Sequence, residues 1–358
     1  MKIVFATPIY PPEIGGPAVY SKKLGEGLVG RGHKVIIVSY SGLKKYPQPL
    51  RIFLYFLRLF QKSFGCDSIY AFNLISCGLP SCWVSMVLRK KFYIRLGGDF
   101  LWERAVESGR TKKPLREYYQ GKKSPRESFW IWVMKMIFNK TTRVIFTSRF
   151  QRDIYLKYFN LAERKTIIIG NPFPDAKEVE NNSSVAGVQL LYAGRLLKLK
   201  NLDLLISAFN RVLQKTGKDL TLKIIGEGPE ENNLKISRNI ILNPPLSQQD
   251  LLAEIKRSYL CVLPSLTEIT PNFALECLKL QKPILLTKET GYFEVFKNDL
   301  VFIDPENEND LVEKMIYLLD ENNYLGYIEK IKKISTQRSW DDVVKEHEES
   351  FIPGGHKI

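Results

Sequence analysis

The sequence has few residues that could hold a metal ion or form a disulfide. Its 358 residues include five cysteines, none in a Cys-x-x-Cys pair, and three histidines that are far apart. Structural zinc sites need clustered cysteines and histidines, so this scarcity argues against a zinc centre. An odd number of unclustered cysteines also indicates free thiols, which persist in a reducing compartment. We therefore expect a cytoplasmic protein without a bound metal or cofactor.

The sequence also lacks a long apolar run. The apolar start, residues 1–6, is too short for a secretion signal, and Pro8 breaks it. No stretch reaches the roughly 18–20 apolar residues that cross a bilayer. Acidic residues are outnumbered by basic ones, 38 to 53, and the formal net charge is +15. This balance favours an anionic partner, either nucleic acid, an anionic membrane or a phosphorylated small molecule, and charge alone does not choose among them.

What the sequence does contain is an alternation of short β-branched apolar runs with helical patterns. Such runs are typical of buried strands in a parallel sheet whose connections are helices. The alternation predicts an α/β fold with doubly wound parallel sheets, followed by two or three helices over 310–351. The predicted strands are 3–6, 34–39, 68–71, 92–96 and 143–147 in the first half, and 190–192, 222–225, 240–242, 259–263 and 284–287 in the second.

The length of the chain and a break in this pattern predict two domains. Turn-forming residues at 170–174 and a polar stretch at 177–187 separate the two alternations and indicate a linker. We predict a first Rossmann-like domain over 1–172, a second over 173–335, and a C-terminal helix over 336–358. Ligands of doubly wound sheets bind beyond the carboxyl ends of the strands. With two such domains, we expect the site in the cleft between them.

Two glycine-containing loops follow predicted strands. Gly15 and Gly16 precede the first predicted helix, where free N–H groups and the helix dipole favour an anion. Gly226 and Gly228 follow a strand of the second half and suit the close approach of a ligand. Neither loop is a Gly-x-Gly-x-x-Gly motif, so they argue little for NAD or FAD. Each could also be an ordinary turn.

Two further loops carry charged side chains. Arg195 and Lys200 follow the first strand of the second half and could bind a diphosphate, and Asn201 is expected to cap the helix that follows. Glu268 lies in a later loop, and Glu276 lies eight positions on, within an apolar helix. A carboxylate in such surroundings needs hydrogen bonds, which the hydroxyls of a ribose would supply. The alternatives are a solvated basic turn and a glutamate that the helix dipole favours.

Taken together, these loops resemble the retaining glycosyltransferases of family 4, which have the GT-B architecture of two Rossmann-like domains. The motifs are Ala-Gly-Arg195 with Lys200, Ile-Ile-Gly226-Glu-Gly228-Pro, and Glu268-x7-Glu276 followed by Lys282-Pro283. The resemblance implies a nucleotide-sugar donor as co-substrate and a C-terminal tail, around Trp340, that packs back on the first domain. It implies that the donor is bound by Gly15, Gly16, Arg195, Lys200, Gly226, Gly228, Glu268, Ile269, Thr270, Pro271, Asn272 and Glu276.

The resemblance also implies residues that act in transfer. Arg195 and Lys200 would stabilise the departing diphosphate, and Glu268 would face the donor sugar. Family members commonly have Gly where this sequence has Ile269, which could narrow the sugar pocket. Asp99 follows a first-half strand, and we hypothesise that it orients the acceptor hydroxyl or the donor sugar; the alternative is a turn aspartate. The sequence has no Asp-x-Asp motif for Mg²⁺, so we expect metal-independent, front-face transfer.

Three segments bear on the acceptor, which we expect to be a glycan or a lipid-linked molecule of cell-surface polysaccharide or glycolipid synthesis. Segments 51–62 and 126–140 are aromatic and basic. We expect buried crossover helices there, and a peripheral contact with an anionic membrane is the alternative. Segment 104–123 is predicted to be a long basic loop opposite the donor domain, either solvated or recruiting an anionic lipid phosphate.

Three other functions compete with this interpretation. A UDP-sugar 2-epimerase of the same architecture would need no acceptor. A basic nucleic-acid-binding module would need a recognition helix, an RNP motif or a zinc finger, and none is visible, so we expect no nucleic-acid partner. A non-catalytic nucleotide-sugar binder would be expected to lack Arg195 or Glu268, and both are present.

Overall fold

The computed structural model describes the chain except residues 14, 44, 176–186 and 352–358. The linker predicted at 177–187 lies almost wholly outside the described residues. The described chain forms two compact units. Unit 1 comprises Met1–Leu101, Gly121–Pro172 and the chain from Ser339 onward, and unit 2 comprises Trp102–Gln120 and Phe173–Arg338. Among the described helices, none is long and apolar enough to cross a membrane.

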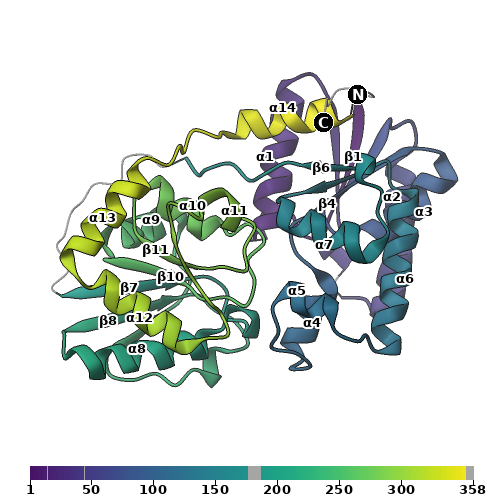
Figure 1. Cartoon of the computed structure of the whole chain (residues 1–358). Coiled ribbons are helices and arrows are strands. Elements are labelled where there is room, and N and C mark those ends of the chain that lie inside the picture. The colour runs from purple at the N-terminus through teal and green to yellow at the C-terminus, as the bar shows by residue number, and fades with distance from the viewer. Residues whose placement is uncertain (14, 44, 176–186, 352–358) are drawn as a thin grey trace. The chain divides into compact units, whose positions relative to one another are not determined.

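Unit 1 is built on a six-stranded parallel sheet in the order β2-β1-β3-β4-β5-β6. Helices α1 and α14 pack against each other, and α2, α3 and α6 form a neighbouring set elsewhere on the unit (Figure 1). The elements are β1 (Lys2–Thr7), α1 (Gly16–Gly30), β2 (Lys34–Ser39), η1 (Ser41–Leu43), α2 (Gln48–Lys62), β3 (Ser68–Ala71), α3 (Gly78–Leu88), β4 (Lys91–Leu96), α6 (Pro125–Lys140), β5 (Arg143–Phe146), α7 (Arg149–Phe159), η2 (Glu163–Lys165), β6 (Thr166–Ile168) and α14 (Trp340–Phe351).

The C-terminal helix completes unit 1. Its Val343, Val344 and Phe351 are buried in the same cluster as Phe5 and Tyr70 of the sheet. A buried histidine, His347, bonds the hydroxyls of Tyr20 at 2.8 Å and Tyr70 at 3.2 Å through its two ring nitrogens. Hydrophobic burial and these polar contacts together attach the tail to the first unit, as the resemblance implied.

Unit 2 is built on a second six-stranded parallel sheet, in the order β12-β11-β10-β7-β8-β9. In Figure 1, α8 and α12 lie on one side of it and α9 and α10 on the other. The elements are α4 (Phe100–Glu107, which starts in unit 1), α5 (Leu115–Gln120), β7 (Val188–Ala193), η3 (Lys198–Lys200), α8 (Leu202–Thr216), β8 (Leu220–Ile225), η4 (Glu231–Asn233), β9 (Ile240–Asn243), α9 (Gln248–Arg257), β10 (Leu260–Leu263), α10 (Asn272–Lys279), β11 (Ile284–Thr287), α11 (Phe293–Phe296), β12 (Val301–Ile303), α12 (Glu308–Leu318) and α13 (Glu321–Lys332).

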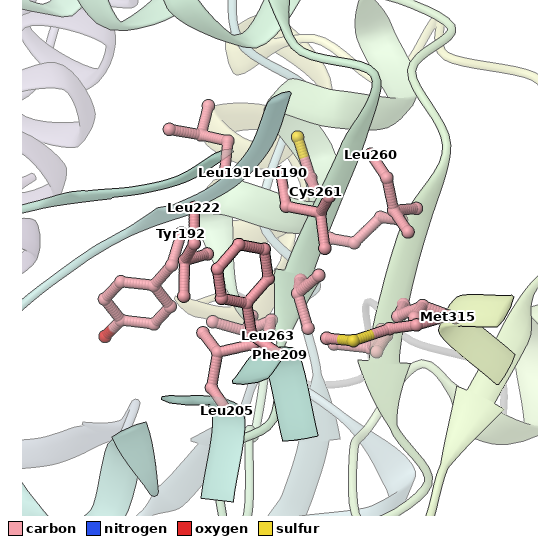
Figure 2. Packing of buried hydrophobic residues seen from close by; sticks show 14 of the residues in the cluster. Leu190, Leu191, Tyr192, Leu205, Phe209, Leu222, Leu260, Cys261, Leu263 and Met315 are labelled. Carbon is pink, nitrogen blue, oxygen red and sulfur yellow. The ribbon is translucent and has the colours of Figure 1, made fainter. Parts of the chain in front are cut away.

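The core of unit 2 lies between β7, β10 and the helices that cover them. Leu191 and Tyr192 of β7 and Leu205 and Phe209 of α8 are completely buried, and Figure 2 shows Leu205 and Phe209 close together, with Leu191 pointing away from them. Strands covered on both faces explain the nearly continuous apolar runs in the sequence. The prediction of parallel doubly wound sheets is confirmed. Strands β6 and β12, each three residues long, were not among the predicted strands.

Candidate functional site

The order of the strands in unit 2 places two loops next to each other. If β7 to β12 are numbered 1 to 6, their order across the sheet is 3-2-1-4-5-6, and the direction of winding reverses between β7 and β10. The connections after these two strands leave toward opposite faces of the sheet, so a gap opens between them that commonly holds a ligand. Loop 194–201 follows β7, and loop 264–271 follows β10.

Lys200 and Glu268 come together at this switch point. The Lys200 Nζ lies 2.5 Å from Glu268 Oε1, and the Ser265 hydroxyl donates to the same oxygen, also at 2.5 Å. Only 19% of the Lys200 side chain and 9% of the Glu268 side chain are exposed. A pair this buried needs its hydrogen bonds to offset the loss of hydration, and Ser265 supplies one. Ser265 was not among the predicted site residues.

Arg195 begins the same loop and is exposed. Its guanidinium contacts no acidic side chain among the described residues, whereas its backbone is held in place. The hydroxyl of Tyr192, a buried residue of β7, donates to the Arg195 carbonyl at 3.0 Å. Burial, and secondarily the charge of Glu268, raises the pKa of Tyr192 well above its usual value, so the hydroxyl remains a donor. The structure therefore offers a fixed loop with a free fork of five N–H donors.

The predicted role of Asn201 is wrong. Asn201 precedes α8, but its side chain makes no capping hydrogen bond to the helix. Its backbone is left-handed, with a φ of 57°, and the amide instead donates to the carbonyls of Pro264 at 3.3 Å and Pro305 at 2.9 Å. Asn201 thus joins the loops that follow β7, β10 and β12, which a local capping argument could not anticipate.

Gly226 and Gly228 are required by the contact between two loops. A Cβ at Gly226 would lie 1.9 Å from the Gly194 carbonyl oxygen, and a Cβ at Gly228 would lie 2.3 Å from the Leu196 carbonyl oxygen. The Leu196 N–H donates to the Glu227 carbonyl at 2.9 Å. The glycines therefore let the loop after β8 pack against the backbone of the loop that carries Arg195 and Lys200.

Glu276 lies on the inner face of α10 and is 9% exposed. Burial raises the pKa of this carboxyl, and a hydrogen bond from the Gln248 side chain opposes that effect. The Gln248 amide donates to Glu276 Oε1 at 2.9 Å. Gln248 begins α9 and was not predicted, because nothing in the sequence links two residues 28 positions apart. Glu276 is thus a costly buried carboxylate with unfilled acceptor capacity.

The segment between Glu268 and Glu276 is held by the loop after β11. The Glu268 N–H donates to the Glu289 carbonyl at 2.9 Å, and Gly291 donates to the carbonyls of Glu268 and Ile269 at 3.1 Å. Ile269 is 7% exposed. Of the remaining predicted donor-binding residues, Thr270 is half-buried, Pro271 is buried and Asn272, the first residue of α10, is exposed.

Residues Trp102–Gln120, which we call the strap, belong to unit 2 although they precede β7 by many residues. Glu107 accepts hydrogen bonds from the backbone of Lys198 at 3.3 Å and Leu199 at 3.1 Å. The Leu115 N–H donates to the Thr267 hydroxyl at 2.9 Å, beside Glu268. The predicted basic loop over 104–123 is therefore wrong: most of it is the strap, which contains helix α5 with one face buried, and it is fastened to two loops of the switch point.

The other predicted residues lie in unit 1. A Cβ at Gly15 would lie 2.8 Å from the Ile9 side chain, whereas Gly16 has open space around it. Asp99 is completely buried, and the Tyr155 hydroxyl donates to its carboxylate at 2.8 Å. Among the described residues, no group of three or more His, Cys, Asp or Glu is placed to hold a metal ion.

Comparison with known proteins identifies the family. Residues 14–177 match the model described as Glycosyltransferase Family 4, and residues 175–336 match Glycosyl transferases group 1. The chain belongs to the group 1 glycosyltransferases. The first half of this glycosyltransferase is of the family 4 type, and the protein is an enzyme that transfers a sugar.

The glycosyltransferase has similar proteins of nearly the same length. An uncharacterised glycosyltransferase of Methanocaldococcus jannaschii is 24% identical over 97% of this chain and 96% of its own. Anabaena HepE, solved with UDP and glucose, is 14% identical with a TM-score of 0.72, covering 98% of this chain and 99% of its own. WaaG, a lipopolysaccharide glycosyltransferase, is 13% identical with a TM-score of 0.72, over 99% and 100%. These likenesses show the GT-B fold.

Proposed function

We propose that unit 2 binds a nucleotide-diphosphate sugar and that the enzyme transfers this sugar, with retention and without a metal, to a glycan or lipid-linked acceptor on the cytoplasmic side. The observation that carries the proposal is the pairing of Lys200 with Glu268 at the switch point, next to the free Arg195. Cations and carboxylates so close together suit a ligand that is anionic at one end and rich in hydroxyls at the other. The UDP and glucose bound by HepE support the donor class.

In this proposal the diphosphate displaces Glu268 from Lys200. The Arg195 fork and the Lys200 ammonium then face the phosphate oxygens, and Glu268 keeps its bond from Ser265 while its carboxylate accepts from sugar hydroxyls. The two cations stabilise the negative charge that grows as the glycosidic bond breaks, which is the work that a metal ion performs in other enzymes. Glu276 accepts from the ribose hydroxyls.

Retention follows if the acceptor attacks the face that the diphosphate leaves. The bond between the anomeric carbon and the phosphate oxygen breaks, the acceptor oxygen bonds to the same face, and its proton passes to the departing phosphate. No carboxylate has to act as a nucleophile on this route. Trapping of a covalent glycosyl-enzyme would refute it.

Asp99 keeps its proposed role on the acceptor side, now as a positioning residue. Because its carboxylate is completely buried and bonded by Tyr155, we propose that it orients the chain after β4 toward the acceptor hydroxyl or donor sugar. Asp99→Ala should raise KM for the acceptor or lower kcat while leaving the donor-induced thermal shift unchanged. Normal transfer by a folded Asp99→Ala variant would remove this role.

The donor proposal is tested first by thermal shift against UDP-, GDP-, ADP- and TDP-sugars, then by transfer assays with the donor that binds. A ligand at about 100 times its Kd adds roughly 2.7 kcal/mol to stability. Arg195→Ala should lower the rate about 10²-fold or more. Arg211→Ala, which removes a half-buried arginine that pairs with Glu308 on α12, is the matched control and should leave the rate unchanged.

Three outcomes would contradict parts of the proposal. Stabilisation by none of the four sugar nucleotides would reject the donor site. Activity that EDTA abolishes and Mg²⁺ restores would reject metal independence. Conversion of the donor to an epimer without any acceptor would reject transfer in favour of an epimerase.

A further inference from the structure

Three neighbouring helices of unit 1 expose large apolar side chains. Helices α2, α3 and α6 pack side by side (Figure 1). Val87 is 63% exposed, Trp132 61% and Phe53 56%. Single exposed apolar residues are common, whereas a contiguous group indicates a binding surface. We call this group the helical face; it comprises Phe53 and Leu57 of α2, Phe64 just after α2, Trp83, Met86 and Val87 of α3, and Phe129 and Trp132 of α6.

The helical face is continuous between α2 and α3. A groove of about 540 Å³ runs between them, and its lining is entirely apolar, including Phe53, Phe56, Trp83 and Met86. Neighbouring rings extend the groove: the ring centres of Phe56 and Trp83 lie 6.3 Å apart, and those of Phe60 and Phe64 lie 4.9 Å apart. The prediction of simple buried crossover helices is therefore wrong in part. Each helix buries one face, as Tyr55 and Ile137 show, and leaves apolar rings on the other.

The charged residues of the three helices that carry the helical face are almost all basic. About one residue in nine of the whole chain is acidic, 38 of 358, yet the three helices contain one acidic residue, Glu127. Glu127 is 8% exposed, and its carboxylate is engaged in the capping box with Ser124. The same helices carry six basic residues, Arg51, Arg58, Lys62, Arg126, Lys135 and Lys140.

We propose that the helical face docks the enzyme on an anionic membrane surface. Aromatic rings that enter the headgroup region and cations that meet lipid phosphates are the pattern of interfacial membrane binding. A second copy of this chain fits less well, because it would bring two cationic faces together. Near an anionic bilayer, each Lys or Arg strengthens binding about five-fold. This surface lies outside the proposed donor site, so either proposal can fail without the other.

The test is co-sedimentation of the full chain with vesicles of phosphatidylcholine alone or mixed equally with phosphatidylglycerol. We expect binding to the mixed vesicles at low salt, little binding to neutral vesicles, and weakening as salt screens the charges. Phe53→Asp with Trp132→Asp should abolish binding. Arg58→Glu with Lys62→Glu should weaken it at least about 25-fold, since two favourable charges are lost.

Matched controls separate this surface from general effects. Leu325→Asp places the same charge on a 52% exposed leucine of α13, and Lys235→Glu reverses an exposed charge of unit 2. Both should bind like the parent. The melting temperature of each variant shows whether it is folded. If a variant fails to fold, tryptophan fluorescence is used in its place: vesicle binding should shift the emission of the parent to the blue, and the shift should be smaller in Trp132→Phe. No binding of the parent to anionic vesicles at low salt would overturn the proposal. An equal loss of vesicle binding in Leu325→Asp would also overturn it. So would a parent that binds no vesicles and instead forms a dimer that Phe53→Asp dissociates.

Discussion

Replacing Glu276 by glutamine should make the ligand-free enzyme more stable and the donor complex weaker. Burial raises the pKa of Glu276 above its ordinary value of 4.5, so the folded protein holds a proton there more tightly than the unfolded chain. Stability therefore falls as the pH rises from 4.5 through the higher folded pKa, and the full penalty is present above that range. An amide carries no such penalty. The variant should melt above the parent at pH 7, and the difference should vanish near pH 4.

The loss of donor affinity can be worked out from hydrogen-bond energies. A hydrogen bond to a charged group contributes about 1.5–3 kcal/mol and a neutral one about 0.5–1.5, so each ribose hydroxyl loses about 1 kcal/mol. Two hydroxyls lose about 2 kcal/mol, which weakens binding about 30-fold. At a donor concentration of about 100 times the parent Kd, the stabilisation falls from about 2.7 to about 0.9 kcal/mol. In a unit of this size that reduces the donor-induced rise in melting temperature from about 5–11 °C to about 2–4 °C.

The assay is a thermal melt at pH 4 and pH 7, with and without the nucleotide sugar. Glu308→Gln is the control with the opposite sign, because a hydrogen bond from Arg211 lowers the pKa of Glu308 and the carboxylate is favoured in the folded state. It should melt below the parent at pH 7 and keep the full donor effect. A Glu276→Gln variant that melts below the parent at pH 7 would refute the burial argument. One that keeps the full donor-induced shift would show that Glu276 does not hold the ribose.

Three further predictions follow from the packing. Gly226→Ala should lower the melting temperature strongly and abolish donor binding, because the added Cβ would meet the Gly194 carbonyl. The control is Gly217→Ala, at a left-handed but open position, which should cost only about 1 kcal/mol of stability. Equal melting temperatures for the two variants would reject the loop contact. Burial raises the pKa of Cys77 to about 12, and all five cysteines are buried, so mass spectrometry should find no iodoacetamide adduct at pH 8 until the protein unfolds. Glu107→Ala should speed amide exchange at Leu199 about five-fold, as roughly 1 kcal/mol of strap contact is lost; unchanged exchange would mean that Glu107 does not hold the strap.

Much of the fold could be predicted from the sequence because its signals are local. Strand runs such as 3–6 and 190–192 are apolar on both faces, which follows directly from burial within a parallel sheet. The resemblance predicted Lys200, Glu268 and Glu276 as site residues, and the structure pairs the first two of them. The errors came where a residue's partner lies far along the chain. Asn201 follows the local rule for a helix cap, yet its amide bonds carbonyls 63 and 104 residues away.

The strap shows the same limit on a larger scale. Residues 104–123 are basic and polar enough to predict a solvated loop, and only the packed structure shows that Leu115 is completely buried and that Glu107 and Leu115 fasten the segment to unit 2. Likewise, the aromatic pattern of α2 and α6 indicated helices with an apolar face. Composition could not tell which rings pack inward and which stay exposed, because that depends on neighbours from other helices.

By itself, the sequence determined the alternation of strands and helices, the family, and the types of side chain at the strand ends, because each is encoded within a few adjacent residues. Only the tertiary structure decided which of these side chains meet. Strand β10 lies beside β7 and not beside β9, and this order brings Lys200 to Glu268 across 68 residues of chain. Strand order arises from how the helices cover the two faces of the sheet, and that energy belongs to the packed unit as a whole.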